Sequence, residues 1–242
     1  MTRRRWIADE VSGARASVLG HNAAHLARSL RVRVGQEFEI STGDAVRLGR
    51  VVHLADDRVE FELGESVPQK EPARITLLLA IFKFDRMEWA IEKATELGVA
   101  AIVPVIAGRT EPHLAKAAGK RVERWRRIAH EAAQQSRRAL PPEIAAPQPL
   151  KSALAVPSEL RILLSESERG LTLKQAIDGN WKLEFGKSII LGIGPEGGWT
   201  ADELSAFDAD GWTPASLGNT ILRVETAAIA ALAIAISEVQ EK

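Results

Sequence analysis

The chain has 242 residues and a formal net charge of zero, and its 45% hydrophobic and 26% charged residues are the proportions of an ordinary globular protein with one or two domains. It has no cysteine, which excludes disulfides, thiolate zinc sites and cysteine nucleophiles. Its start, MTRRRWIADEV, lacks the apolar run of a secretory signal, and its longest apolar run, 227–236, is about half the length of a membrane span. We expect a soluble, cytoplasmic protein with no membrane segment.

The charge is unevenly distributed along the chain. Residues 1–33 carry seven arginines against two acidic side chains, a net charge of +5, and residues 116–138 carry a net charge of +6. The rest of the chain must sum to −11. Two basic patches of this kind could contact a polyanion such as a nucleic acid, or they could be solvated faces, and both interpretations stay open.

Short strands separated by turns are predicted for the first seventy residues. Between the basic start and these strands, residues 21–32 have the apolar spacing of one short helix. Alternating or β-branched runs predict strands at 37–42, 46–54 and 59–63. A few short strands of this kind are expected to form a small barrel or a twisted sheet. The two prolines of 65–74 then indicate a linker.

The pattern changes to alternating buried strands and helices after this linker. A continuous apolar run predicts a strand at 74–82, and a helix follows at 85–98, with Asp85 as its capping residue and Gly98 as its stop. The later elements are a strand at 99–107, a basic helix at about 116–138, a strand at 160–166, a short helix near 171–177 and a strand at 188–194. This order predicts an α/β domain with a mostly parallel sheet.

The last helix of the chain is alanine-rich and apolar nearly all round from 227 to 236. A helix without a polar face must be buried. We expect it to pack against its own sheet or against a partner subunit.

A glycine-rich loop, LGIGPEGGWT, occupies residues 191–200. Its Gly-x-Gly-x-x-Gly spacing matches a dinucleotide-binding turn, but it lies some 120 residues into the domain, where no second half follows. Glu196 would repel a pyrophosphate, and no Gly-Lys-Ser/Thr follows to make a P-loop. Thr200 and Glu203 form a capping box for a helix directly after the loop. The loop suits a neutral or cationic ligand approached by glycine backbone, and a tight turn without any ligand is the alternative.

Four segments of the chain resemble one family in order and spacing. They are KFDRMEWAIEKATELGV (83–99), RWRRIAHEAAQQSRR (124–138), GIGPEGGWTADE (192–203) and LGNTILRVETA (217–227). They resemble the RsmE family, 16S ribosomal RNA uridine-N3 methyltransferases of the SPOUT class. The turn AGRT (107–110) and Trp199 depart from the usual family pattern, which has a serine-rich turn and phenylalanine there.

The resemblance implies a fold, a cofactor and partners. Residues 1–72 would form a PUA-like RNA-binding β-barrel, and residues 73–242 an α/β SPOUT methyltransferase domain with a C-terminal trefoil knot. The family methylates 16S rRNA of the small ribosomal subunit with S-adenosylmethionine, and it works as a homodimer. The methyl donor is a sulfonium cation without phosphate, so a loop with glycines and one glutamate suits it better than NAD. A catalytically silent RNA-binding or ribosome assembly factor on the same fold is the alternative.

The resemblance also implies which residues hold the cofactor. These are Leu191, Gly192, Gly194, Pro195, Glu196, Gly197, Gly198, Leu217, Gly218, Ile221, Leu222, Arg223, Thr226 and Ala227. No metal is expected, although His21 and His25 are four residues apart, because the glutamate of the helical metal motif is missing.

Methylation of uracil N3 requires loss of the N3 proton and leaves negative charge on O2 and O4. An arginine could stabilise that charge and a carboxylate could accept the proton, so Arg223 and Glu225 are the catalytic candidates, with Arg86 as a second cation. A structural ion pair between Arg223 and Glu225 is the alternative. The predicted RNA contacts are Arg3, Arg4, Arg5, Arg31, Lys83 and Arg86. The target nucleotide, and the choice between free rRNA and an assembled subunit, stay open.

Overall fold

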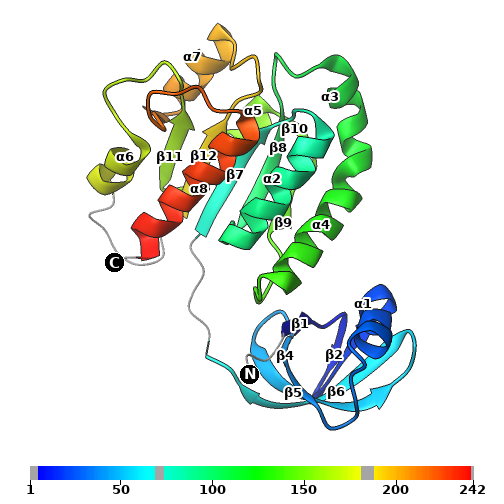
Figure 1. Ribbon diagram of the computed structural model, residues 1–242. Helices are drawn as coiled ribbons and strands as arrows, with labels where there is room; N and C mark the ends of the chain where they lie inside the picture. The colour runs from blue at the N-terminus through cyan, green and yellow to red at the C-terminus, as the bar shows by residue number, and fades with distance from the viewer. Residues whose placement is uncertain (1–4, 69–73, 181–187, 241–242) are drawn as a thin grey trace. The chain divides into compact units, whose positions relative to one another are not determined.

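The structure, a computed structural model, describes residues 5–68, 74–180 and 188–240 (Figure 1). Contacts divide the chain into two compact units, one of Met1–Glu71 with Ala133–Pro141 and one of Pro72–Ala132 with Pro142–Lys242. No helix within the described ranges has the length and hydropathy needed to cross a membrane.

The first unit contains a six-stranded sheet in the order β1-β4-β5-β6-β3-β2. Its strands are β1 (Arg5–Ile7), β2 (Glu10–Ser12), β3 (Arg15–Leu19), β4 (Glu37–Ser41), β5 (Val46–Leu54) and β6 (Arg58–Ser66). The three predicted strands are confirmed as β4, β5 and β6. The sequence analysis missed β1, β2 and β3, because they are only three to five residues long and lie among charged residues.

One continuous segment joins the two edges of this sheet. β1 pairs with β4, and β2 pairs with β3. Between them, the Ala8 N–H donates to the Ser41 carbonyl at 2.9 Å, and the Asp9 N–H donates to the Ser17 carbonyl at 2.9 Å. The side chains enclosed by the sheet form one buried core that includes Trp6, Val18, Leu26, Ile40, Val51 and Phe61. Their burial removes apolar surface from water, which stabilises the unit by about 1.5–3 kcal/mol per large side chain.

The predicted helix at 21–32 is present as two short pieces. α1 (Gly20–Ala24) continues into η1 (His25–Ser29), which is a π-helix. Ala23 and Leu26 bury this segment against the sheet core. Arg31 follows with a positive φ of 48°, and its side chain is exposed.

The second unit is built on a seven-stranded parallel sheet in the order β10-β8-β7-β12-β11-β13, with β9 also paired to β8. The α/β prediction is therefore confirmed. The strands are β7 (Arg74–Ala80), β8 (Ala101–Ile106), β9 (Glu143–Ile144), β10 (Gln148–Pro149), β11 (Leu160–Leu164), β12 (Ser188–Ile193) and β13 (Thr213–Ala215).

Helices pack against both faces of this sheet. They are α2 (Phe84–Leu97), α3 (Pro112–Ala118), η2 (Gly119–Arg121), α4 (Val122–Gln135), α5 (Leu150–Ala153), α6 (Leu173–Asn180), α7 (Ala201–Ala209) and α8 (Val224–Gln240). Figure 1 shows α2 and α8 side by side on one face. The predicted basic helix at 116–138 is divided into α3, η2 and α4.

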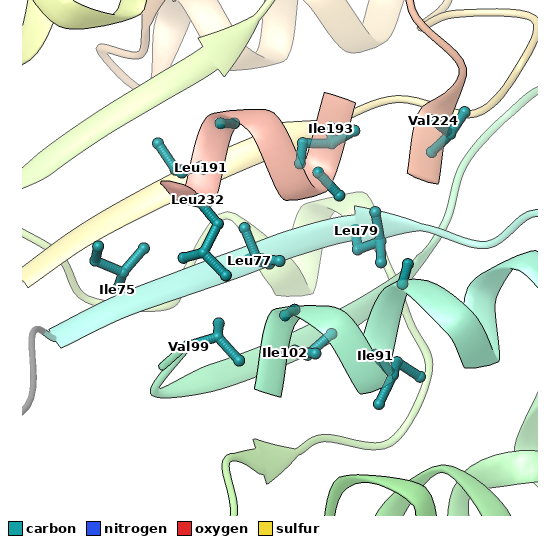
Figure 2. Packing of buried hydrophobic residues seen from close by; sticks show 14 of the residues in the cluster. Ile75, Leu77, Leu79, Ile91, Val99, Ile102, Leu191, Ile193, Val224 and Leu232 are labelled. Atoms are coloured by element: carbon teal, nitrogen blue, oxygen red, sulfur yellow. The ribbon is translucent and has the colours of Figure 1, made fainter. Parts of the chain in front are cut away.

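The alternation of side chains along β7 places a core on each face of the sheet. Ile75, Leu77 and Leu79 belong to the larger core, which Figure 2 shows with Leu232 of α8 and Ile91 of α2. The residues between them, Leu78 and Ala80, belong to the second core with Trp199, Phe207 and Trp212. A strand covered on both faces has no polar position, which explains its continuous apolar sequence.

Two predicted helix boundaries have different outcomes. Gly98 ends α2 in the left-handed conformation with a φ of 106°, as predicted. The capping role of Asp85 is wrong: Lys83 is the N-cap residue, and no side chain caps α2. Glu88 of α2 accepts two hydrogen bonds of 2.7 Å from Arg124 of α4.

α8 is buried along one face. Ala228, Ala231, Leu232 and Ala235 are fully buried in the larger core of the sheet. The opposite face is exposed in the single chain at Thr226, Ala233 and Ser237. The expected contact of α8 with its own sheet is confirmed.

Candidate functional site

Three loops of the second unit meet at the carboxyl edge of its sheet. β7, β8 and β12 are adjacent and parallel, so the residues after each strand emerge at the same edge. These are 81–83 after β7, 107–110 after β8 and 194–198 after β12. This edge is where open α/β sheets bind their ligands.

The glycine loop after β12 is a tight turn that leads directly into α7. The Gly198 N–H donates to the Pro195 carbonyl at 2.8 Å, which closes a four-residue turn, and Gly198 has a φ of +70°. Glu196 and Gly197 at the centre of the turn are exposed. The predicted capping box is confirmed, because Thr200 accepts from the Glu203 N–H and Glu203 accepts from the Thr200 N–H.

Two glycines of this loop have a packing reason for lacking a side chain. A Cβ at Gly192 would lie 3.1 Å from Trp212 and 3.2 Å from Leu163, so protein fills the space that the sequence analysis left for a ligand. A Cβ at Gly194 would lie 3.0 Å from the Trp199 Nε1. Leu191 is fully buried, so it can offer a ligand only its backbone. The exposed binding surface of the loop therefore begins at Glu196.

The turn 107–110 is tied to the glycine loop and to α7. The Arg109 Nη1 donates to the Gly197 carbonyl at 2.5 Å, and the Gly108 N–H donates to Glu203 Oε1 at 2.7 Å. Thr110 is buried, and its hydroxyl accepts from the Ala107 N–H and donates to the Ile81 carbonyl. Two hydrogen bonds thus join this turn to the other two loops, and a third ties it to α7.

A cavity of about 250 Å³ lies between these loops. Its exposed wall carries two cations and two carboxylates, Lys83, Arg109, Glu111 and Glu196. Its buried wall is apolar and includes Ile81 and Leu114. The cavity brings Lys83, a predicted RNA contact, together with Glu196 and Gly197, which are predicted cofactor contacts.

The second predicted cofactor segment, 217–227, begins in the connection from β13 to α8 and continues into the first turn of α8. The Ser216 hydroxyl accepts from the Gly218 N–H at 3.0 Å, and Gly218 has a φ of +122°, a conformation that favours glycine. Ile221 is 81% exposed and Arg223 is exposed.

The structure pairs the catalytic candidates differently from the expectation. Glu225 is buried on the first turn of α8, and its Oε1 lies 3.5 Å from the Arg86 Nη1. Its Oε2 is buried without a hydrogen-bond partner among the described residues. Arg223 makes no ion pair in the part of the chain that the structure describes. The expected alternative, an Arg223–Glu225 ion pair, is therefore wrong, and Arg86 takes that place.

The predicted RNA contacts other than Arg86, which pairs with Glu225, fall into three groups. Arg3 and Arg4 lie outside the described residues. Arg5 is engaged within its own unit, because it binds Glu39 at 2.7 Å and the Arg137 carbonyl at 2.5 Å. Arg31 and Lys83 are exposed and have no ion-pair partner among the residues that the structure describes.

Lys93 and His25 lie outside the site. Lys93 binds Glu92 and Glu96 at 2.7 Å, and these contacts raise the pKa of Lys93 above its ordinary value, which suits a structural role. His25 lies beside the Trp6 ring, with 6.0 Å between the ring centroids. The described ranges contain no group of three metal-ligating side chains.

Sequence reasoning missed Arg109, Glu111 and the link from Gly108 to Glu203. A signal was available for Arg109, since a charged residue directly after a buried parallel strand lies at the ligand-binding edge. The link between Gly108 and Glu203 joins positions 95 residues apart, and no local pattern indicates it.

Known proteins are similar to this chain in sequence and in fold. Residues 69–236 match the family model of the RNA methyltransferase domain. The ribosomal RNA small subunit methyltransferase E of Synechocystis sp. is 36% identical over 86% of this chain and 68% of its own length. The protein of that name from Mycobacterium bovis is 36% identical over 91% and 86% of the two chains.

A solved structure is similar over nearly the whole length. The ribosomal RNA small subunit methyltransferase E of Neisseria gonorrhoeae, bound to S-adenosyl methionine, superposes with a TM-score of 0.80 and 30% identity, covering 96% of each chain. From the match over residues 69–236 and these relatives, we conclude that the chain belongs to the RNA methyltransferase family.

Proposed function

We propose that this protein transfers a methyl group from S-adenosylmethionine to N3 of a specific uridine in 16S rRNA of the small ribosomal subunit. The observation that carries this proposal is the exposed turn of the glycine loop at the carboxyl edge of the sheet. It combines the backbone of the exposed residues Glu196 and Gly197, where the Gly197 carbonyl already accepts from Arg109, with the carboxylate of Glu196. That chemistry fits a sulfonium cation and disfavours a phosphate, and a relative of this family binds S-adenosyl methionine.

The cofactor is proposed to lie against the two predicted segments, 191–198 and 217–227. Within the first, the exposed residues Glu196 and Gly197 can offer both backbone and charge, whereas Leu191 and Gly192 can offer backbone only. Within the second, Ile221 supplies apolar surface that a bound molecule would cover. When bound, the cofactor supplies an electrophilic methyl group on a cationic sulfur.

The chain's own charged groups are proposed to handle the proton and the negative charge of the uracil. Arg223 is exposed and makes no ion pair with the described residues, so its guanidinium is available to the charge that develops on O2 and O4. One oxygen of Glu225 has no hydrogen-bond partner in the described part of the chain, and this is the oxygen proposed to accept the N3 proton. Arg86 holds the other oxygen of Glu225 and so fixes its orientation.

We also propose the finer architecture that the family resemblance implies. Residues 1–72 would be a PUA-like barrel that binds RNA, supported by the segment that joins the edges of its sheet. Residues 73–242 would be a SPOUT domain whose segment 217–223 belongs to a trefoil knot. The exposed face of α8 would lie in a homodimer interface, and the protein would act in the cytoplasm, where ribosomal subunits assemble.

Methyl transfer to ribosomal RNA tests this function. The protein is incubated with tritiated S-adenosylmethionine and either 16S rRNA or small subunits from a strain that lacks the gene. We expect label in the RNA and 3-methyluridine in its nuclease digest by mass spectrometry. Binding of cofactor and RNA without transfer would instead indicate a silent assembly factor, and binding of NAD at comparable affinity would contradict the cofactor assignment.

A further inference from the structure

The cavity between the three loops is smaller than the pockets that hold large cofactors. Its volume of about 250 Å³ lies below the range of roughly 300–1,000 Å³ that is usual for drug-sized ligands. It shares Gly197 and Glu196 with the proposed cofactor loop. A ligand in this cavity would therefore be a small group that lies next to the cofactor.

Arg109 is held at this cavity with most of its hydrogen-bonding capacity unused. A guanidinium has five N–H donors, and one hydrogen bond of Arg109 goes to the Gly197 carbonyl. Its other donors have no acceptor among the described residues. The aliphatic part of Arg109 also packs on Gly197, where a Cβ would lie 3.3 Å from Cδ. The guanidinium is thus pre-oriented by the glycine loop and free to bind a ligand.

The charges around the cavity favour a neutral ligand with several acceptors. Lys83 and Arg109 supply donors, but Glu111 and Glu196 line the same wall, so the cations are balanced. A phosphate would meet two carboxylates, and its desolvation would be poorly compensated. A uracil base has two carbonyl oxygens and carries no charge, and the apolar surface of Ile81 and Leu114 suits the face of its ring.

We propose that this cavity, whose lining does not include Arg223 or Glu225, receives one carbonyl edge of the target uracil. Arg109 is then the positioning residue that links this edge to the cofactor loop. One side of the guanidinium holds the Gly197 carbonyl, and the other donates to a uracil carbonyl oxygen. RNA binding then fixes the glycine loop, and each ligand strengthens the binding of the other, as linkage requires. This inference rests on the proposed function.

The test is the coupling between the two ligands. Calorimetry measures the affinity of S-adenosylhomocysteine for the full chain, alone and saturated with unmethylated 16S rRNA. We expect about a tenfold increase in affinity with RNA for the unmodified protein. Arg109→Met keeps the packing on Gly197 but removes the guanidinium, so the increase should fall below about twofold. Arg109→Lys should restore part of it, because a point charge cannot bridge two acceptors as a planar fork does.

Arg74→Met is the matched control. Arg74 is an exposed arginine at the opposite end of β7, roughly 20 Å away by the rise of the strand, and it should keep the full coupling. Thermal unfolding confirms that each variant is folded. Unchanged coupling in folded Arg109→Met would overturn the inference. If the unmodified protein fails to bind the cofactor or to methylate RNA, the proposed function fails instead.

Salt dependence separates a base contact from a phosphate contact. A lost phosphate contact reduces the slope of log affinity against log salt by about 0.7–0.9, whereas a lost base contact leaves the slope unchanged. We expect Arg109→Met to raise the KM for RNA about tenfold, equivalent to about 1.4 kcal/mol, with an unchanged slope. A slope reduced by about one unit would assign the cavity to a phosphate and overturn its assignment to uracil.

Discussion

Arg223 and Arg86 are two arginines at one site with different surroundings. Arg86 lies 3.5 Å from a buried carboxylate, whereas Arg223 is exposed and makes no ion pair within the described ranges. A guanidinium that already pairs with a carboxylate before RNA binds stabilises a developing anion less than an unpaired guanidinium does. The surroundings therefore favour Arg223 for the electrostatic role and Arg86 for orienting Glu225.

Arg223→Ala should cost turnover far more than cofactor affinity, because the uracil anion exists only on the way to product. Loss of one preorganised donor is worth about 3–4 kcal/mol, or roughly 10² to 10³ in kcat. Single-turnover methylation and calorimetry with S-adenosylhomocysteine measure the two quantities. If both fall together with the melting temperature, Arg223 is structural.

Gly192 has no room for a side chain. We expect Gly192→Ala to destabilise the protein by about 1–3 kcal/mol, because a Cβ would meet Trp212 and Leu163 at little more than 3 Å. Gly179→Ala is the control, since nothing lies within 4 Å of a Cβ at this position of α6. That change should be neutral or stabilise by up to about 1 kcal/mol. Urea denaturation of both variants gives the comparison, and equal stabilities would contradict the packing argument.

Local sequence patterns predicted the structural roles of residues whose partners lie close to them in the chain. The capping box needs only Thr200 and Glu203, and Gly98 needs only its own helix, so both were predictable. The ion pair of Glu225 joins it to Arg86, and Arg109 binds Gly197 across 88 positions. Such pairs depend on the order of strands in the sheet, and no local pattern specifies that order.

At the scale of elements, α7 does more than follow the glycine loop. Its capping residue Glu203 uses one oxygen for the Thr200 N–H and the other for the Gly108 N–H. The start of α7 therefore fixes the turn after β8 as well as its own first turn. A change at Glu203 should affect two loops, whereas a change at Thr200 should affect one.

Thr200→Ala should lower the free energy of unfolding by about 1 kcal/mol, the usual cost of a lost N-cap. Glu203→Ala should cost more, by roughly another 1 kcal/mol, because it leaves the Gly108 N–H as well as the Thr200 N–H without an acceptor. Denaturant titrations of the single and double variants test this order. A smaller effect for Glu203→Ala would show that the turn 107–110 does not depend on α7.

At the scale of the whole molecule, the elements were more predictable than their arrangement. Continuous apolar runs identified β7, β8, β11 and β12, because a strand buried on both faces has a distinctive composition. The position of β12 between β7 and β11 had no such signal. The strands β1, β2 and β3 were missed because they are only three to five residues long. β1 and β3 are further defined by pairing with the distant strands β4 and β6, which no local pattern shows.

The exposed face of α8 predicts association of two chains. Light scattering should give about twice the 26.3 kDa of one chain at micromolar concentration. Ala233→Glu places a charge on the exposed face and should shift the protein to monomers. Ala209→Glu makes the same change at an exposed position of α7 and should leave the dimer intact. A monomer for the unmodified chain would contradict the proposed interface.

The position of β12 in the sheet also determines when the domain can fold during synthesis. Ile75 of β7 pairs with Ile189 of β12, a separation of 114 positions. A ribosome that has not yet released β12 therefore presents β7 with one edge open and its apolar faces incompletely covered. Long-range parallel pairing is slow, and such edges favour aggregation. We therefore expect the nascent chain to be prone to aggregation until β12 has emerged and paired with β7.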